Sequence, residues 1–163
     1  MPKRDSGSTE SSAVPQAISG LIPELPVVPQ LIGLAHLQGK ARFDEFLAGT
    51  AITSITHWAV LERIREMPGI TGVTLASQLR VTPQAVQLVL RQLESKSLIS
   101  RTPQGTAMMT YLTKEGRKAL KSSKSAVERY TSLTTGGLSP EELVQLERLL
   151  TVYVKAVADP MRL

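Results

Sequence analysis

The chain has 163 residues, a length that suits one domain or one domain with an appended dimerisation region. It contains no cysteine, which excludes disulfides, thiol catalysis and cysteine-bound zinc. Apolar residues make up 42% of the chain, yet no window approaches the roughly 18 apolar residues of a membrane span, and the polar N-terminus lacks the apolar segment of a secretory signal. We therefore expect a cytoplasmic protein without membrane contact.

The net charge of +5 is concentrated in one part of the chain. Residues 71–112 hold four basic residues and one acidic residue, and residues 113–130 hold six basic and two acidic residues, whereas the other segments are neutral or slightly negative. Such a local excess is typical of a surface that binds a polyanion. For residues 113–130 taken alone, the alternative is an ordinary solvated helix face.

Residues 1–25 are polar, rich in serine and then interrupted by prolines, so we expect a disordered tail and an extended lead-in. The prolines predict that no helix begins until after Pro29. Apolar residues then recur at helical spacing over residues 30–47, and again over residues 54–64. The second of these helices should end before Pro68-Gly69.

Residues 71–112 contain the most informative order of elements. Thr71 can cap a third helix over residues 72–80, and Thr82 followed by Pro83 predicts the start of a fourth, because threonine accepts a free amide and proline has none. Residues 99–112 are expected to form a hairpin that turns at Gln104-Gly105. This order is that of a winged helix-turn-helix, which lays its second helix in the DNA major groove.

The C-terminal part predicts two further helices. Thr113 should cap a basic helix that runs to about Ser132, and Ser139-Pro140-Glu141-Glu142 has the pattern of a capping box at the start of the last helix. The last helix has large side chains at alternating steps of three and four, namely Leu143, Leu146, Leu150, Tyr153 and Val157. Such a seam favours packing against another helix, plausibly from a second subunit.

In this layout the chain resembles the MarR family of bacterial transcription regulators. The matching stretches lie within residues 30–158 and are His57-Trp58-Ala-Val-Leu61, Leu75-Ala76, Val81-Thr-Pro-Gln84, Leu93-Glu94, Leu98-Ile99 with Arg101, Leu112-Thr-Lys-Glu-Gly116 and Gly137-Leu-Ser-Pro-Glu-Glu-Leu143. Their order and spacing carry the resemblance, since no single motif is specific. It implies a homodimer, formed by the terminal helices, that binds a pseudo-palindromic operator in double-stranded DNA and is often released by a small-molecule effector.

Two features depart from the family pattern. The stretch Arg101–Ala107 is about three residues shorter than a usual wing and lacks the Asp and Arg found near its tip. Arg80 stands at a turn where the family often has glycine.

The sequence thus predicts a mainly α fold: a winged helix-turn-helix with a small antiparallel β-wing and terminal dimerisation helices. The expected organisation is a tail over residues 1–25, an N-terminal dimerisation helix over 26–52, the DNA-binding domain over 53–116 and C-terminal dimerisation helices over 117–163.

Residues that the core does not need on the fourth helix and the wing are the candidates for DNA contact. Gln and Arg side chains can read adenine and guanine, an exposed Leu or Ala can meet a thymine methyl group, and a helix N-terminus can take a phosphate. The candidates are Thr82, Gln84, Ala85, Gln87, Leu88, Arg91, Arg101 and Gln104. The alternative for the helix is an ordinary polar face, and Arg101 is expected to contact phosphate rather than a base.

The sequence contains no phosphate-binding glycine loop, no nucleophile with a matching base and no metal-ligand cluster, so neither an enzyme nor a cofactor is expected. The two histidines should be isolated residues at a core or dimer edge, and Trp58 a core residue. The resemblance implies an effector pocket near the first, second and fifth helices, for which His36, Arg42, His57 and Trp58 are weak candidates.

Two other functions remain open for this layout. The shortened wing also suits a winged-helix module that docks protein instead of DNA. The dimerisation domain of an enzyme is a third possibility, which the lack of a catalytic region disfavours.

Overall fold

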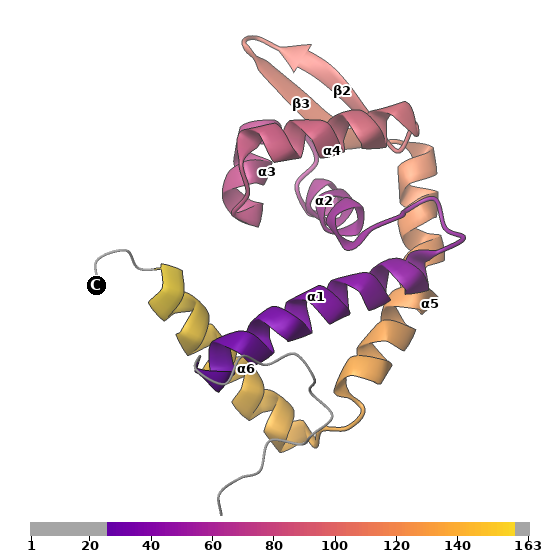
Figure 1. Ribbon diagram of the computed structural model, residues 1–163. Coiled ribbons are helices and arrows are strands. Elements are labelled where there is room, and N and C mark those ends of the chain that lie inside the picture. Colours follow the sequence, from indigo (N-terminus) through magenta and orange to yellow (C-terminus); the bar gives the residue numbers. More distant parts are fainter. Residues whose placement is uncertain (1–25, 159–163) are drawn as a thin grey trace, which may run out of the picture. The chain divides into compact units, whose positions relative to one another are not determined.

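The computed structural model describes residues 26–158, and these residues form a mainly α-helical structure with one small sheet. The described residues up to Leu37 belong to one compact unit and those from Gln38 onward to another. The tail expected over residues 1–25 lies outside the described residues. The elements are α1 (Val27–Leu47), α2 (Ile55–Glu66), β1 (Ile70–Thr71), α3 (Gly72–Leu79), α4 (Pro83–Ser95), β2 (Ile99–Gln104), β3 (Ala107–Leu112), α5 (Lys114–Thr135) and α6 (Pro140–Ala158) (Figure 1).

Helix α1 begins earlier than the sequence predicts. It starts at Val27 and includes Pro29, so the expectation that no helix precedes the end of the proline stretch was wrong. Proline is tolerated in a first turn because the amide that it lacks would have no partner within the helix. At the other end of α1, the Phe43 ring packs edge-on against Tyr130 of α5, with ring centroids 4.8 Å apart.

The helix-turn-helix forms from local signals at each boundary. The side chains of Ser54, Thr71 and Thr82 accept hydrogen bonds from the first-turn amides of α2, α3 and α4. The turn between α3 and α4 includes Arg80 in the left-handed region, with φ of 52°. This conformation favours glycine, which is the residue that the family often has here.

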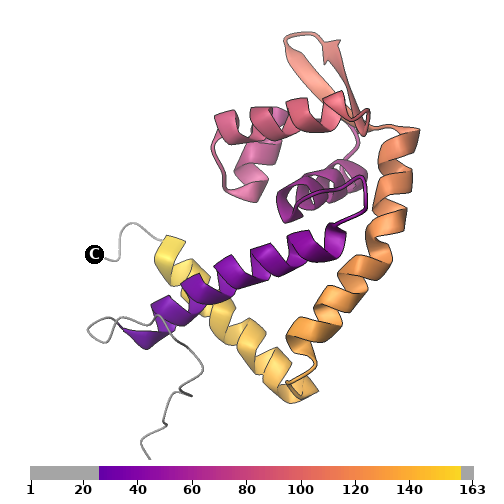
Figure 2. The same ribbon diagram turned by 45° about the vertical axis from the view of Figure 1, so that its right-hand side comes forward.

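The sheet is antiparallel and has the order β1-β3-β2. Strands β2 and β3 form the hairpin, with Gln104 paired to Ala107 and the turn made by Gly105 at a φ of 59°. The short strand β1 pairs with β3 and was not predicted, because two residues are too few to produce a periodic signal. Figures 1 and 2 show the hairpin projecting beyond α4, with the start of α5 next to the base of the hairpin.

One hydrophobic core joins the helix-turn-helix to the end of α1, the base of the hairpin and the first half of α5. Its fully buried large side chains include Leu47, Ile52, Leu61, Ile64, Leu75, Leu90 and Leu93. The inner face of α4 is fully packed, since Val86, Leu90 and Leu93 are at most 1% exposed. The core therefore fixes which side of α4 faces outward.

Helices α5 and α6 differ in how they are packed. Thr113 caps α5, which buries Ala119, Leu120, Ser123 and Ala126. The capping box of α6 is confirmed, because Glu142 N–H donates to Ser139 Oγ and Ser139 N–H donates to Glu142 Oε2. None of the residues of α6 is buried.

Within residues 26–158, no helix has the length and apolar character needed to span a membrane. The same residues bring no group of three or more His, Cys, Asp or Glu side chains together around a possible metal site.

Candidate nucleic-acid interface

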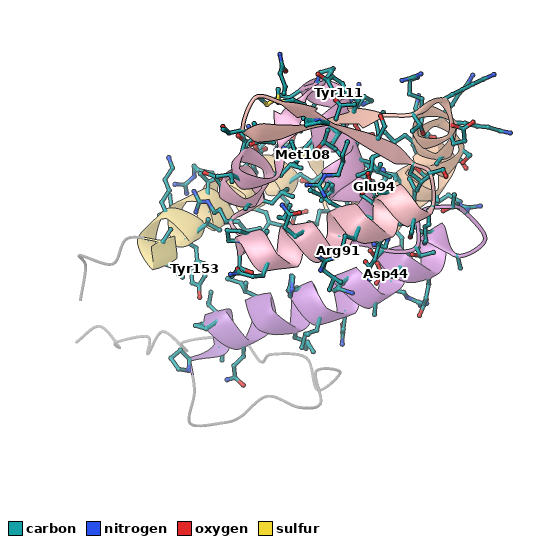
Figure 3. The ribbon with its side chains drawn as sticks, turned by 90° about the horizontal axis from the view of Figure 1, so that it is seen from above. Asp44, Arg91, Glu94, Met108, Tyr111 and Tyr153 are labelled. Carbon is teal, nitrogen blue, oxygen red and sulfur yellow. The ribbon has the colours of Figure 1, made fainter. Side chains whose placement is uncertain are left out.

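The outer face of α4 is the centre of the candidate interface. Thr82 Oγ1 accepts a hydrogen bond from the Ala85 amide at 3.2 Å, and Pro83 follows as the first helical residue. Four of the predicted contact residues, Gln84, Ala85, Leu88 and Arg91, are exposed on this face. Leu88 is 52% exposed, which leaves a large apolar side chain in solvent next to polar neighbours. In Figure 3, Arg91 lies on α4, whereas Met108 and Tyr111 lie on the hairpin.

Gln87 lies at the edge of that outer face and makes contacts within the chain. It is half-buried, and its Oε1 accepts a hydrogen bond from Arg101 Nη2 of β2 at 3.2 Å. Its Nε2 lies so close to Gly72 that a Cβ there would be 2.6 Å away. The two amide atoms of Gln87 are thus directed toward β2 and the start of α3.

Arg101 lies at the base of the hairpin rather than at its tip. Besides its bond to Gln87, it has a buried Nε without a hydrogen-bond partner, and the hydroxyl of Thr110, its cross-strand partner, is also buried and unpaired. Removing a donor and an acceptor from water without a partner is costly.

The tip of the hairpin carries no charge. From Thr102 to Thr110 every residue is uncharged, and Gln104, predicted to contact DNA, is exposed next to the turn. Met108 is 39% exposed and pairs across the hairpin with Pro103. The tip thus offers apolar and amide contacts but no ion pair to a phosphate.

Helix α5 has an excess of positive charge, with six basic and two acidic residues. Lys114, Lys118 and Lys121 are exposed along this helix. Lys124 lies 3.7 Å from Glu128 in an exposed ion pair, which contributes little to stability. Arg117 donates a hydrogen bond to the Leu112 carbonyl at 2.9 Å, which ties the helix to the end of the hairpin.

A pocket of about 550 Å³ opens between α2 and α5. Its lining combines an apolar wall with several cations and consists of Trp58, Glu62, Arg65, Arg117, Leu120, Lys121, Lys124 and Val127. The Glu62 carboxylate accepts a hydrogen bond from Arg65 Nε at 2.6 Å and raises the pKa of that guanidinium. The pocket is therefore suited to a ligand with an apolar ring and a negative charge.

Of the four predicted effector residues, only Trp58 lines this pocket. His36 is exposed on α1, in the compact unit that ends at Leu37. Arg42 is exposed and forms a 2.6 Å ion pair with Glu45. His57 points elsewhere: it is 8% exposed and its Nε2 lies 3.0 Å from Gln92 Oε1 of α4.

The sequence interpretation missed the cations of the pocket, although a signal for them exists. Residues 58, 62 and 65 of α2 and residues 117, 121 and 124 of α5 each repeat at steps of four and three, which places each set on one helix face. No such signal exists for the contact between His57 and Gln92, which are 35 residues apart in the chain.

The structure has a helix-turn-helix whose capped second helix faces outward, followed by a two-stranded wing. This arrangement is that of a winged helix-turn-helix protein. Residues 53–105 match the model of the MarR family. The chain is 26% identical over 100 residues to an HTH-type transcriptional repressor of Mycobacterium tuberculosis. The aligned residues cover 60% of this chain and 72% of the relative.

Solved structures give the same result. A mutant MarR from E. coli, crystallised with operator DNA, superposes with a TM-score of 0.72 at 25% identity, covering 82% of this chain and 96% of that one. MepR from S. aureus, also solved with DNA, has a TM-score of 0.74 at 23% identity, covering 80% and 97%. The chain is thus similar to the MarR family in residues 53–105 and shares the winged helix-turn-helix fold of these structures.

Proposed function

We propose that this protein is a sequence-specific DNA-binding transcriptional regulator whose α4 enters the major groove. The observation that carries the proposal is the outer face of α4, where Gln84, Leu88 and Arg91 are exposed opposite a fully packed inner face. Amide and guanidinium groups read base edges in the major groove, and an apolar side chain meets the thymine methyl group. On a helix face that only contacts solvent, an exposed leucine such as Leu88 would make no favourable contact.

The relatives support repression as the direction of regulation. The mycobacterial relative is named as a repressor, and the E. coli MarR structure contains operator DNA. We infer that this chain likewise binds an operator, and that a pseudo-palindromic operator would match a two-fold symmetric dimer.

The dimer is proposed from the state of α6. Seven large apolar side chains of α6 are exposed: Val144, Leu146, Leu149, Leu150, Val152, Val154 and Val157. Soluble monomers rarely leave so many large apolar side chains on one helix. A second copy of the same helix pattern would cover part of them, since Leu143, Leu146, Leu150, Tyr153 and Val157 repeat at steps of three and four.

The response to a small ligand is proposed for the pocket between α2 and α5. Lys121 and Lys124 supply positive charge, and Trp58 supplies a flat apolar surface. Trp58 is the only tryptophan of the chain, so the fluorescence of the protein reports on the surroundings of this one side chain. Benzoate, a minimal ring with one carboxylate, should change that fluorescence in a saturable way, and the Lys121→Gln variant should weaken the binding of benzoate. A linear response without saturation would argue against the pocket as a ligand site.

Selection of bound fragments from random duplex DNA tests the main proposal. The purified protein should enrich one motif, and Arg91→Ala should weaken binding to that motif by about 1–3 kcal/mol while binding to random DNA changes little. Gln145→Ala, a substitution on the exposed surface of α6, is the matched control and should leave both affinities unchanged. Enrichment of no motif would remove sequence-specific reading from the proposal.

The second candidate function is a winged-helix module that docks protein, and the uncharged hairpin tip with its exposed Met108 favours it. Salt dependence separates the two functions, because phosphate contacts release counterions. If α5 lies along DNA, replacing Lys114, Lys118 and Lys121 by Gln should flatten the plot of log affinity against log salt by about one unit per contact. An unchanged slope would assign these lysines to a solvated face.

A further inference from the structure

Four polar side chains connect α2 with the C-terminal end of α4. His57 Nε2 lies 3.0 Å from Gln92 Oε1, and His57 Nδ1 lies 3.2 Å from Thr53 Oγ1. Lys96, the C-cap residue of α4, donates a hydrogen bond from Nζ to the same Thr53 hydroxyl at 3.1 Å. These hydrogen bonds connect Gln92 of α4 to His57 of α2, His57 to Thr53, and Thr53 to Lys96 at the end of α4. Thr53 directly precedes Ser54, the cap of α2.

Only one arrangement of protons satisfies all of these contacts with a neutral imidazole. Gln92 Oε1 is an acceptor, so His57 Nε2–H donates to it, and Nδ1 then accepts from the Thr53 hydroxyl. That hydroxyl oxygen accepts from Lys96 in turn. His57 is 8% exposed, so an imidazole without these partners would bear the desolvation of its ring nitrogens.

The position of His57 is set by the start of α2. Ser54 caps this helix by accepting a hydrogen bond from the His57 amide at 3.2 Å, which fixes His57 in the first turn. The apolar core locates α4 through Val86, Leu90 and Leu93, but apolar contacts are non-directional. The directional contact between α2 and the last turns of α4 is the hydrogen bond from His57 to Gln92.

We propose that His57 is a positioning residue for the reading helix: through Gln92 it fixes the orientation of α4, and so the direction in which Gln84, Leu88 and Arg91 point. The inference rests on the proposed function of α4. It gives no base contact to His57, which lies behind the interface. A small rotation of α4 displaces groups that must meet base edges at hydrogen-bond distance. Contacts to the phosphates of the DNA backbone carry no sequence information and depend less on this rotation.

Two substitutions at the same position separate this role from a general role in folding. A glutamine amide at position 57 occupies the place of the imidazole Nε2 and keeps the bond to Gln92, whereas an asparagine amide occupies the place of Nδ1 and keeps only the bond to Thr53. His57→Asn should weaken binding to the selected operator about three- to tenfold, the usual effect of one hydrogen bond, and His57→Gln less than twofold. Binding to random duplex DNA should stay unchanged in both.

A double-mutant cycle identifies the partner. Gln92→Met keeps the length and helix propensity of the side chain but removes the acceptor. It should reproduce the loss seen in His57→Asn, and the combined variant should show no further loss. Thermal unfolding of all variants monitors folding.

Three outcomes would overturn the inference: equal operator affinity of His57→Asn and the native protein, equal losses on operator and random DNA, or additive losses in the cycle. If the native protein selects no operator, the proposed function fails separately. The hydrogen bond between His57 and Gln92 is then tested by 15N NMR of the imidazole. A fixed Nε2–H tautomer that becomes mixed in Gln92→Met would support the contact between α2 and α4, and an unchanged spectrum would refute it.

Discussion

The winged helix-turn-helix and helix α6 both contain many apolar side chains, but only the helix-turn-helix buries them. In the helix-turn-helix, Leu61, Leu75, Leu90 and Leu93 are fully buried. They share one core with residues of the hairpin and α5. In α6, Leu146 is 43% exposed, Leu149 49% and Leu150 39%. The first region completes its core within one chain, whereas the second leaves its apolar residues to be covered by another surface.

This difference shows that an apolar helix face does not by itself indicate where a core lies. The stability of the helix-turn-helix should be a property of one chain and independent of protein concentration. The order of α6 should depend on association and therefore on concentration. The following substitutions test that division, from the largest expected effect on unfolding to the smallest.

Leu90→Ala should have the largest effect. Leu90 is fully buried on α4, so the substitution removes apolar contacts and leaves a cavity, with an expected loss of about 2–5 kcal/mol in the free energy of unfolding. Urea unfolding followed by circular dichroism measures it, and the loss should be the same at low and high protein concentration. A loss that disappears at high concentration would mean that the domain core depends on the partner.

Gly116→Ala should come next. Gly116 lies in the first turn of α5, and a Cβ there would overlap the Leu98 carbonyl oxygen, a backbone atom that cannot easily move. Overpacking of this kind costs about 1–3 kcal/mol. The same urea unfolding measures it, with Gly33→Ala as the control, because a Cβ at Gly33 would meet no atom within 4 Å. Equal stability of Gly116→Ala and the native protein would contradict the close approach of α5 to Leu98, the residue before β2.

Ser139→Ala should have a smaller effect, confined to α6. The Ser139 side chain caps this helix, and loss of such a cap costs about 1 kcal/mol. Amide hydrogen exchange should show faster exchange in the first turns of α6, with no change in α2 to α4. Faster exchange across the whole chain would mean that α6 and the helix-turn-helix unfold together.

The double substitution Leu146→Asn and Leu150→Asn should have the smallest effect on the unfolding of a single chain, within about 0.5 kcal/mol, because both side chains are exposed. It should nevertheless weaken self-association at least tenfold in sedimentation equilibrium. Glu147→Gln, on the same helix, is the control and should leave association unchanged. An unaltered dimer in the double variant would locate the interface away from these leucines.

Much of the fold could be predicted because its signals are local. Thr71, Thr82, Thr113 and Ser139 each satisfy amides of the helix that directly follows, so four helix starts were predicted from a few adjacent residues. The inner face of α4 followed from its helical period. The start of α1 was predicted too late, because the position of a proline within a helix decides whether it is tolerated, and the sequence pattern alone did not reveal that position.

The candidate site could be predicted only in part. The exposure of Gln84, Leu88 and Arg91 followed from the period of α4, since they lie opposite its apolar residues. Gln87 was placed on the same face, yet it turns toward Arg101 of the hairpin, because β2 packs beside α4. The cations of the pocket are spread over two helices whose contact does not show in either helix alone.

The sequence by itself determined which segments become helices, where most of them begin, and which side of α4 is apolar, because capping and periodicity depend on neighbours within a few residues. Only the tertiary structure decided that Gln92 bonds to His57 and Gln87 to Arg101, and that the apolar residues of α6 stay uncovered in one chain. These outcomes depend on contacts between residues far apart in the sequence. Such contacts exist only once the helices have packed, and a polar side chain on a helix keeps the same local pattern whether it meets a partner or solvent.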